Sequence, residues 1–234
     1  MEGPTVSLLD QPLPLTGTCL LLIRHGQTPY NAEGRAQGWL DIPLSPLGYR
    51  QADATAGKLA EHRIDALYSS PLNRAYATAL AIGRPHGLVP RTLPGLREIH
   101  TGALTGRTWA EAEALFPEAI AAFRAAEEAM PHPRHRELIP GWEPIAAFVG
   151  RVWEATHRIV EDHPGQKVAV VCHGGVLNAL LTHLMTGLRA TEESWTYRHD
   201  NVAVSEVRLA GPEPVLVAFN QALHGVQGPG EVIF

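Results

Sequence analysis

Residues 18–26 read TCLLLIRHG, a short apolar run that stops at an arginine, a histidine and a glycine. A run of this length without polar alternation is typical of a β-strand buried on both faces. A second run, VAVVCHGG at 168–175, ends in the same way. Ligands of open α/β sheets bind beyond the carboxyl ends of the strands, so both His-Gly pairs are predicted to reach the ligand position.

Strand and helix patterns alternate along most of the chain. Ser45 suits a helix N-cap and Pro46 the first position of a helix that runs to about residue 61. Further helices are expected at 71–83, 143–162 and 174–184, a strand at 64–70, and a closing hairpin from NVAVSEVRL (201–209) and PVLVAF (214–219). This order predicts an α/β protein, a three-layer α/β/α fold with a mainly parallel central sheet.

The 234 residues, 45% of them hydrophobic, suit one domain with an elaboration. Residues 1–17 read as a loosely ordered N-terminal extension and residues 18–234 as a single domain. From about 102 to 142 no strand pattern appears, whereas Thr108 and Glu111 form a capping box before an Ala/Glu-rich helical pattern that is interrupted at Pro117. We expect this segment to be a helical insertion, or lid, that caps the active site.

Composition and missing motifs exclude several classes of function. The net charge is −5 and the basic residues are scattered, so nucleic acid is not an expected partner, and no apolar run is long enough for a membrane span. Cys19 and Cys172 lie in apolar runs, which is typical of free buried cysteines and of a reducing, cytoplasmic setting. Walker, zinc-helix and serine-elbow motifs are absent, and His132 and His135 have no acidic or cysteine partner in their loop, so no metal is expected.

The two strand ends predict a binding site for an anion. Arg24 and His25 follow the first strand, His173 the later one, and Arg74 lies in the first turn of the helix after the strand at 64–70. A helix that begins at Gly174 adds free backbone N–H groups. Two arginines and two histidines suit a doubly charged oxyanion, most simply phosphate. Taken singly, His25 is better interpreted as a strand-end cap and Arg74 as a side chain with a solvated or structural role; the repeated His-Gly pair favours a site.

Five blocks of the sequence together resemble one family. In order they are LIRHGQTPYN, DIPLSPLGYRQA, LYSSPLNRAYATA, LREIHTGALTG and VVCHGGVLNALL, spread over about residues 20–186. They are similar to the histidine phosphatase superfamily, the phosphoglycerate-mutase-like enzymes. The resemblance implies an enzyme that needs no cofactor and acts on a small phosphorylated substrate.

Roles for individual residues follow from that resemblance. His25 would be the nucleophile that forms a phosphohistidine, and Arg24, Arg74 and His173 would hold the phosphoryl oxygens. Asn31 matches a position that also contacts the phosphoryl group, with Thr28 in support. Glu98, in LREI, matches the general acid, which protonates the leaving oxygen and then takes a proton from the attacking water. Without the family blocks, Glu98 is better interpreted as a partner of Arg97 or as a charge on the approach to a helix.

The blocks favour the phosphatase branch of the superfamily. The acid block lacks the RHYG that is characteristic of cofactor-dependent mutases, and only 75 positions separate Glu98 from His173. We therefore predict a metal-independent phosphatase of small phosphomonoesters. Phosphoglycerate mutase and a non-catalytic phospholigand-binding module stay open as alternatives, and so does a homodimer formed through the closing strand.

Substrate choice is expected to depend on the insertion. The family often has GES where residues 141–144 read GWEP, which puts the substrate contacts near Trp142 in question. Arg134 and Arg136 are interpreted as solvated loop charges, with recognition of a second anionic group as the alternative. The larger apolar residues of the insertion are interpreted as its own core rather than as the lining of a leaving-group site: Trp109, Phe116, Phe123, Met130 and Trp142.

Overall fold

The computed structural model describes residues 11–187, 191 and 197–226. Its centre is a six-stranded sheet with the order β3-β2-β4-β1-β5-β6. β3, β2, β4 and β1 run parallel to one another, and β5 is antiparallel to both β1 and β6. The strands span β1 Thr18–Arg24, β2 Ala66–Ser69, β3 Arg91–Thr92, β4 Lys167–Cys172, β5 Val204–Leu209 and β6 Val215–Gln221. The predicted mainly parallel sheet with a closing hairpin is confirmed.

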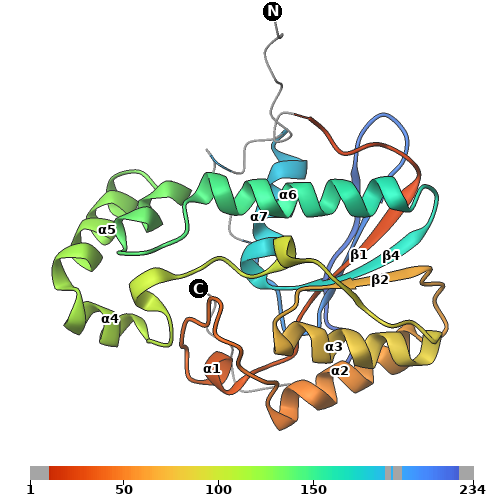
Figure 1. Cartoon of the computed structure of the whole chain (residues 1–234), viewed down its shortest axis with the longest axis horizontal. Coiled ribbons are helices and arrows are strands. Elements are labelled where there is room, and N and C mark those ends of the chain that lie inside the picture. The colour runs from red at the N-terminus through yellow and green to blue at the C-terminus, as the bar shows by residue number, and fades with distance from the viewer. Residues whose placement is uncertain (1–10, 188–190, 192–196, 227–234) are drawn as a thin grey trace, which may run out of the picture.

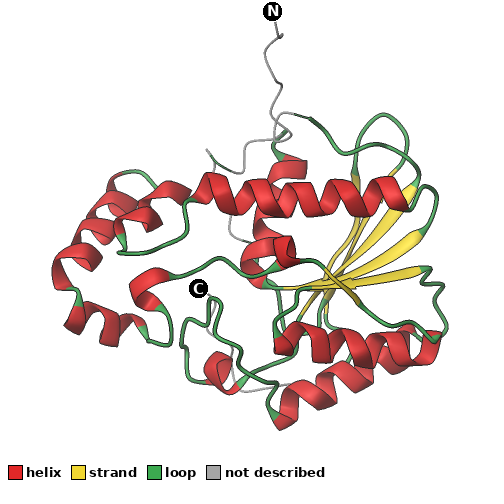
Figure 2. Ribbon diagram, in the orientation of Figure 1, coloured by secondary structure: helices red, strands yellow, loops and turns green. Residues whose placement is uncertain are grey.

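Helices cover both faces of the sheet, as Figures 1 and 2 show. One face carries α6 and α7 and the other carries α2 and α3, which confirms the three-layer α/β/α architecture. The main helices are α2 Pro46–Leu59, α3 Asn73–Gly83, α6 Ile145–Asp162 and α7 Gly174–Met185.

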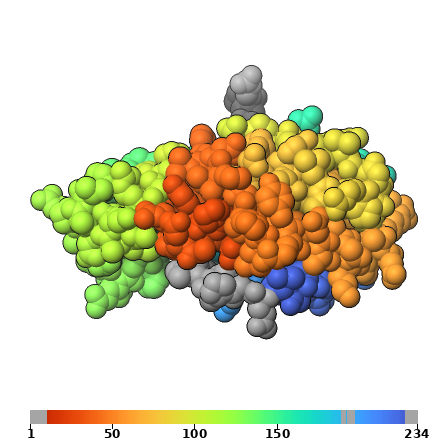
Figure 3. Space-filling model, turned by 90° about the horizontal axis from the view of Figure 1, so that it is seen from below, coloured from red at the N-terminus to blue at the C-terminus, as the bar shows by residue number. Residues whose placement is uncertain are grey.

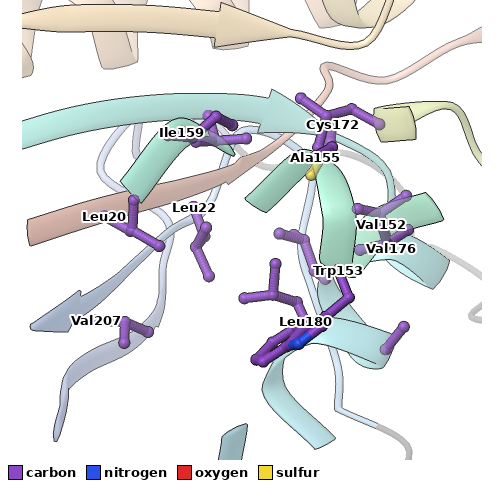
Figure 4. Close-up of a cluster of buried hydrophobic side chains, with 14 of the residues drawn as sticks. Leu20, Leu22, Val152, Trp153, Ala155, Ile159, Cys172, Val176, Leu180 and Val207 are labelled. Carbon is purple, nitrogen blue, oxygen red and sulfur yellow. The ribbon is translucent and has the colours of Figure 1, made fainter. Parts of the chain in front are cut away.

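Alternate residues of β1 build two separate cores. Leu20 and Leu22 pack in the cluster under α6 and α7, where Trp153 is 1% exposed (Figure 4). Leu21 and Ile23 pack in the cluster formed with α2 and α3. All four side chains are buried, so the unbroken apolar run at the start of the chain reflects a strand with a core on each side.

Local signals explain where the helices begin. The Ser45 hydroxyl accepts from Gly48 N at 3.1 Å, so Ser45 is the N-cap of α2 as predicted. Gly48 also lets α2 approach the loop after β1, because a Cβ atom there would lie 2.1 Å from Gln27 O. The short helix α1 (Pro29–Ala32) and strand β3 were not predicted, since four and two residues are too short to show a period.

The insertion is helical and has its own small core. It contains η4 Gly102–Leu104, α4 Trp109–Leu115, α5 Pro117–Ala129 and η5 Pro133–Leu138, and α4 and α5 lie at one end of the molecule in Figure 1. The capping box of Thr108 and Glu111 is present. Trp109 stacks on Phe123, whereas Met130 is exposed. The core is formed by Ala36, Leu104, Ala112, Ile120, Phe123, Ile139 and Trp142.

The insertion is tied to the loop that follows α1. Ala36 N donates to Arg107 O at 3.0 Å, and the Arg35 guanidinium pairs with both Glu33 and Glu111. In the space-filling view of Figure 3, the segment near residue 30, in red to orange, lies between the green insertion and the orange and yellow helices. One wall of the site described below is therefore built by the lid and this loop together.

Residues 11–17 differ from the expected loose extension. Leu13 is 2% exposed, and the Gln11 carbonyl accepts from the Trp153 indole N–H at 3.0 Å. Leu13, in LPLTG, thus completes the hydrophobic core under α6. Residues 1–10 lie outside the described residues. Among the described helices, none combines the length and the apolarity needed to cross a membrane.

Candidate active site

The two predicted histidines meet at the carboxyl ends of β1 and β4. These strands are parallel neighbours with Arg24 opposite Cys172, so the residue after each strand comes to the same place. The His25 and His173 rings lie 5.2 Å apart between centroids and are 3% and 0% exposed. The repeated His-Gly signal therefore marks one site and not two.

Backbone geometry fixes the tautomer of His25. Its Nδ1 lies 2.7 Å from Gly26 O, and because a carbonyl only accepts, Nδ1 carries the hydrogen. Burial, together with the positive charges of Arg74 and Arg24, lowers the pKa of His25 well below its ordinary value. The ring is therefore neutral, and its Nε2 keeps an unprotonated lone pair.

His173 is held by a residue that the sequence reasoning missed. Its Nε2 lies 2.8 Å from the Ser70 hydroxyl, and Ser70 N donates to Val171 O directly after β2. Burial, together with the positive charges of Arg74 and Arg24, lowers the pKa of His173 well below its ordinary value. The signal that could have found Ser70 is the LYSS strand end, a third carboxyl end beside the other two.

Two arginines, Arg24 and Arg74, supply positive charge at the strand ends of the site. Arg74 is 1% exposed and donates to Leu40 O at 2.8 Å and to Gly38 O at 2.9 Å, while its buried Nε has no hydrogen-bond partner in the described part of the chain. Burial lowers the pKa of Arg74 to about 10, which still leaves it charged at neutral pH. Arg24 donates to His199 O at 2.5 Å. The carbonyls of Leu40 and Gly38 thus fix the orientation of the Arg74 guanidinium, and its Nε remains available to a ligand.

Asn31 reaches the pocket, whereas Thr28 lies behind it. Thr28 is the N-cap of α1, and the Asn31 Oδ1 accepts from Thr28 N at 3.1 Å. Asn31 lines the same pocket as Arg24 and His25, but Thr28 does not. Because Thr28 occupies the oxygen end of the Asn31 amide, its Nδ2 is the end available to a ligand.

Glu98 lines the same pocket as His25. Its carboxylate accepts from Ile99 N at 2.9 Å and from Gly175 N, in the first turn of α7, at 3.1 Å. Gly174 also lines the pocket. A Cβ atom at Gly175 would lie 2.3 Å from Glu98 Oε1, so only glycine lets the carboxylate approach this backbone.

Arg151 and Trp39 hold the backbone of Glu98, and neither was predicted. Arg151, on α6, donates to Gly95 O at 2.9 Å, to Arg97 O at 2.6 Å and to Glu98 O at 2.8 Å. The Trp39 indole N–H donates to Glu98 O at 2.6 Å. The Arg97 guanidinium lies 5.3 Å from the Trp39 ring centroid. Arg97 therefore stacks on Trp39, and the alternative in which it pairs with Glu98 is not what the structure shows.

The residues that stand in place of GES have defined contacts. Glu143 accepts from Arg151 Nε at 2.8 Å and from His100 N at 3.0 Å, so it braces the same loop. Trp142 is 7% exposed and is part of both the lid core and the pocket lining. Arg136 also lines the pocket, so its interpretation as a solvated loop charge is wrong, whereas Arg134 is exposed as expected.

Residues 20–222 match the histidine phosphatase superfamily (branch 1), so the chain belongs to this family. The metal-independent phosphoserine phosphatase of Arabidopsis thaliana is 35% identical over 210 residues, covering 88% of this chain and 83% of that protein. The glucosyl-3-phosphoglycerate phosphatase of Mycobacterium tuberculosis is 37% identical over 174 residues, covering 71% and 74%. The solved structure of Bacillus stearothermophilus YhfR has a TM-score of 0.73 and 28% identity, covering 88% and 98%. The protein is a phosphoric monoester hydrolase of the histidine phosphatase type.

Acid should destabilise the protein through three buried histidines. Burial lowers the pKa of His25, His173 and His199, the last to about 4. Below about pH 6.5 the unfolded chain binds protons that the folded chain does not, so the stability present at higher pH is lost as pH falls toward the folded pKa values. Each group should cost about 1.4 kcal/mol per pH unit in that window.

Urea unfolding between about pH 7.5 and 5.5 measures this loss. The free energy of unfolding should fall with a slope that steepens to about three protons at the acid end of this range, and His199→Gln should remove about one of them there. An unfolding free energy that stays level across this range would contradict the assignment of neutral, buried rings.

Proposed function

We propose that the protein is a metal-independent phosphatase that hydrolyses small phosphomonoesters through a phosphohistidine on His25, with Glu98 as general acid and base. The observation that carries this proposal is the hydrogen bond from His25 Nδ1 to Gly26 O, which frees Nε2 for attack beside two arginines. The relatives support the reaction class, since one is named as a metal-independent phosphoserine phosphatase and another as a glucosyl-3-phosphoglycerate phosphatase.

The substrate's phosphoryl group would bind at the carboxyl ends of β1 and β4. Arg24, Arg74 and the Asn31 amide line the pocket and would donate to its oxygens, as would the backbone N–H of Gly174. His173 lies behind this lining, and its Nδ1, which has no partner in the described part of the chain, would complete the set. These donors are fixed before the substrate arrives, so they stabilise charge as it develops without reorganising.

Two displacements would then complete the reaction. In the first, His25 Nε2 forms a bond to phosphorus, the P–O bond to the leaving group breaks, and protonated Glu98 gives its proton to the departing oxygen. In the second, water attacks phosphorus, the carboxylate of Glu98 takes the proton, and the N–P bond breaks. Phosphate leaves, and both residues return to their starting states.

Turnover of p-nitrophenyl phosphate in the presence of EDTA tests the proposal. We expect hydrolysis that neither EDTA nor added Mg²⁺ changes. Loss of activity in EDTA with recovery on adding a divalent cation would contradict it. Tight binding of phosphate esters without hydrolysis at any pH would favour the non-catalytic alternative, and isomerisation of 3-phosphoglycerate stimulated by 2,3-bisphosphoglycerate would favour the mutase.

Gly175→Ala should slow catalysis by displacing Glu98. The added Cβ would meet the carboxylate at 2.3 Å, and a shift of about 1 Å in a reacting group can cost about 100-fold in rate. The matched control is Gly174→Ala, whose Cβ would meet Arg24 Nε at an ordinary 3.8 Å and should cost far less. Steady-state kinetics of both variants measure the difference; equal losses would contradict this role for Gly175.

The expected homodimer and cytoplasmic location stay predictions. Cys19 and Cys172 are both buried and free, as the sequence predicted.

A further inference from the structure

Arg136 brings a positive charge from the lid into the active-site pocket. It lies in η5, far in sequence from the strand ends, yet it lines the same pocket as His25 and Glu98. Arg134, two residues earlier in η5, is exposed and does not line the pocket. The two arginines that look equivalent in the sequence therefore have different surroundings.

The Arg136 guanidinium has no ion pair and makes no hydrogen bond with any residue that the structure describes. Its contact is the Trp142 ring, 5.6 Å from the guanidinium carbon to the ring centroid. Elsewhere in the site, Arg35 pairs with Glu33 and Glu111. The side chain is half-buried, and this burial lowers the pKa of Arg136. The carboxylates of Glu127 and Glu98 are near enough to act on this charge but form no ion pair with it, so its N–H donors remain available to an anion that arrives with the ligand.

Trp142 adds a second donor on the same side of the pocket. The residue is 7% exposed, and its buried Nε1–H has no hydrogen-bond partner within the described part of the chain. A buried N–H without a partner is costly, and most such groups in proteins are paired. Arg136 and Trp142 thus leave donors unused in one region of the pocket lining.

This region is separate from the donors that suit the phosphoryl group. Arg24, Arg74 and Asn31 come from β1, α3 and α1, whereas Arg136 and Trp142 come from the end of the insertion. A substrate whose phosphate lies on the strand ends would present its leaving group to the lid. The Arg136 guanidinium and the Trp142 indole N–H together match a carboxylate, which has one negative charge and two acceptor oxygens.

We propose that Arg136 and Trp142 form a second oxyanion subsite, which selects phosphomonoesters whose leaving group carries a carboxylate. This inference rests on the proposed function, which supplies the phosphoryl end of the site. In this proposal two lid residues determine the choice of substrate. One of them, Trp142, stands where the family often has a small polar sequence.

A matched pair of esters tests the subsite. 3-Phosphoglycerate and glycerol 3-phosphate share a skeleton and differ in a carboxylate against a hydroxymethyl group. We expect kcat/KM to favour 3-phosphoglycerate by about 10- to 100-fold, because a charged hydrogen-bond partner is lost with the neutral ester. Arg136→Met, which keeps an unbranched stem over Trp142, should bring this ratio close to one. Arg134→Ala, the matched control, should leave the ratio as in the unmodified enzyme.

Each outcome decides between defined possibilities. A ratio that survives Arg136→Met, with melting temperature unchanged, would overturn the subsite. If the variant melts earlier, Arg136→Lys keeps the charge and should restore the preference in part; no recovery with a folded protein would also overturn it. Preference for glycerol 1,3-bisphosphate over 3-phosphoglycerate would overturn the assignment of a carboxylate and indicate that the subsite binds a second phosphate. Failure to hydrolyse either ester or p-nitrophenyl phosphate would instead overturn the proposed function.

Discussion

His25→Ala should lower kcat/KM for every phosphomonoester by about 10⁴-fold or more, because removing the nucleophile of a covalent mechanism leaves only binding and electrostatic effects. The neutral ring, with its Nδ1 hydrogen donated to Gly26 O, is the group that the account requires to attack phosphorus. Steady-state kinetics with p-nitrophenyl phosphate and 3-phosphoglycerate measure the loss.

The control for this variant is His62→Ala, which removes an exposed histidine outside the pocket and should have no effect on turnover. Circular dichroism and the melting temperature of His25→Ala check that the fold is retained. Turnover within about tenfold of the unmodified enzyme would show that His25 is not the nucleophile.

Glu98→Gln should produce a loss that depends on the leaving group. The glutamine keeps the size of the side chain but cannot give a proton, so esters with alkyl leaving groups should react about 10²- to 10⁴-fold more slowly. p-Nitrophenolate leaves without a proton, so its release in the first turnover should be far less affected. The second step still needs a base for water, and turnover should then be slow.

Rapid mixing of Glu98→Gln with p-nitrophenyl phosphate should therefore give a burst of p-nitrophenol followed by slow steady-state release. Burst size should match the concentration of sites. Equal losses for alkyl and nitrophenyl esters, without a burst, would contradict the role of Glu98 as acid and base.

Much of the fold could be predicted because its signals are local. Residues 19–23 of β1 are all apolar, and this marks a strand with a core on both faces. Ser45 and Thr108 mark helix starts through hydrogen bonds to backbone atoms three residues on. The His25 and His173 positions were accessible as well, since strand ends of a parallel sheet meet at one edge.

The rest of the site depends on contacts between distant segments. Arg151 is one arginine on an amphipathic helix, and only tertiary packing brings it to the carbonyl of Glu98. Gly175 is required because of a carboxylate 77 positions away. Arg134 and Arg136 have the same local sequence character, and the rotation of η5 decides which one faces the pocket and which one faces solvent.

The central claim is the covalent bond between phosphorus and His25, and trapping it is the most direct test. The enzyme is mixed with a phosphorus-labelled ester, quenched in denaturant at high pH during turnover, and digested for peptide mapping. The account predicts label on the peptide that contains His25, stable to alkali, released by acid, and absent from His25→Ala. Turnover without any labelled protein, or label that survives acid on another residue, would contradict it.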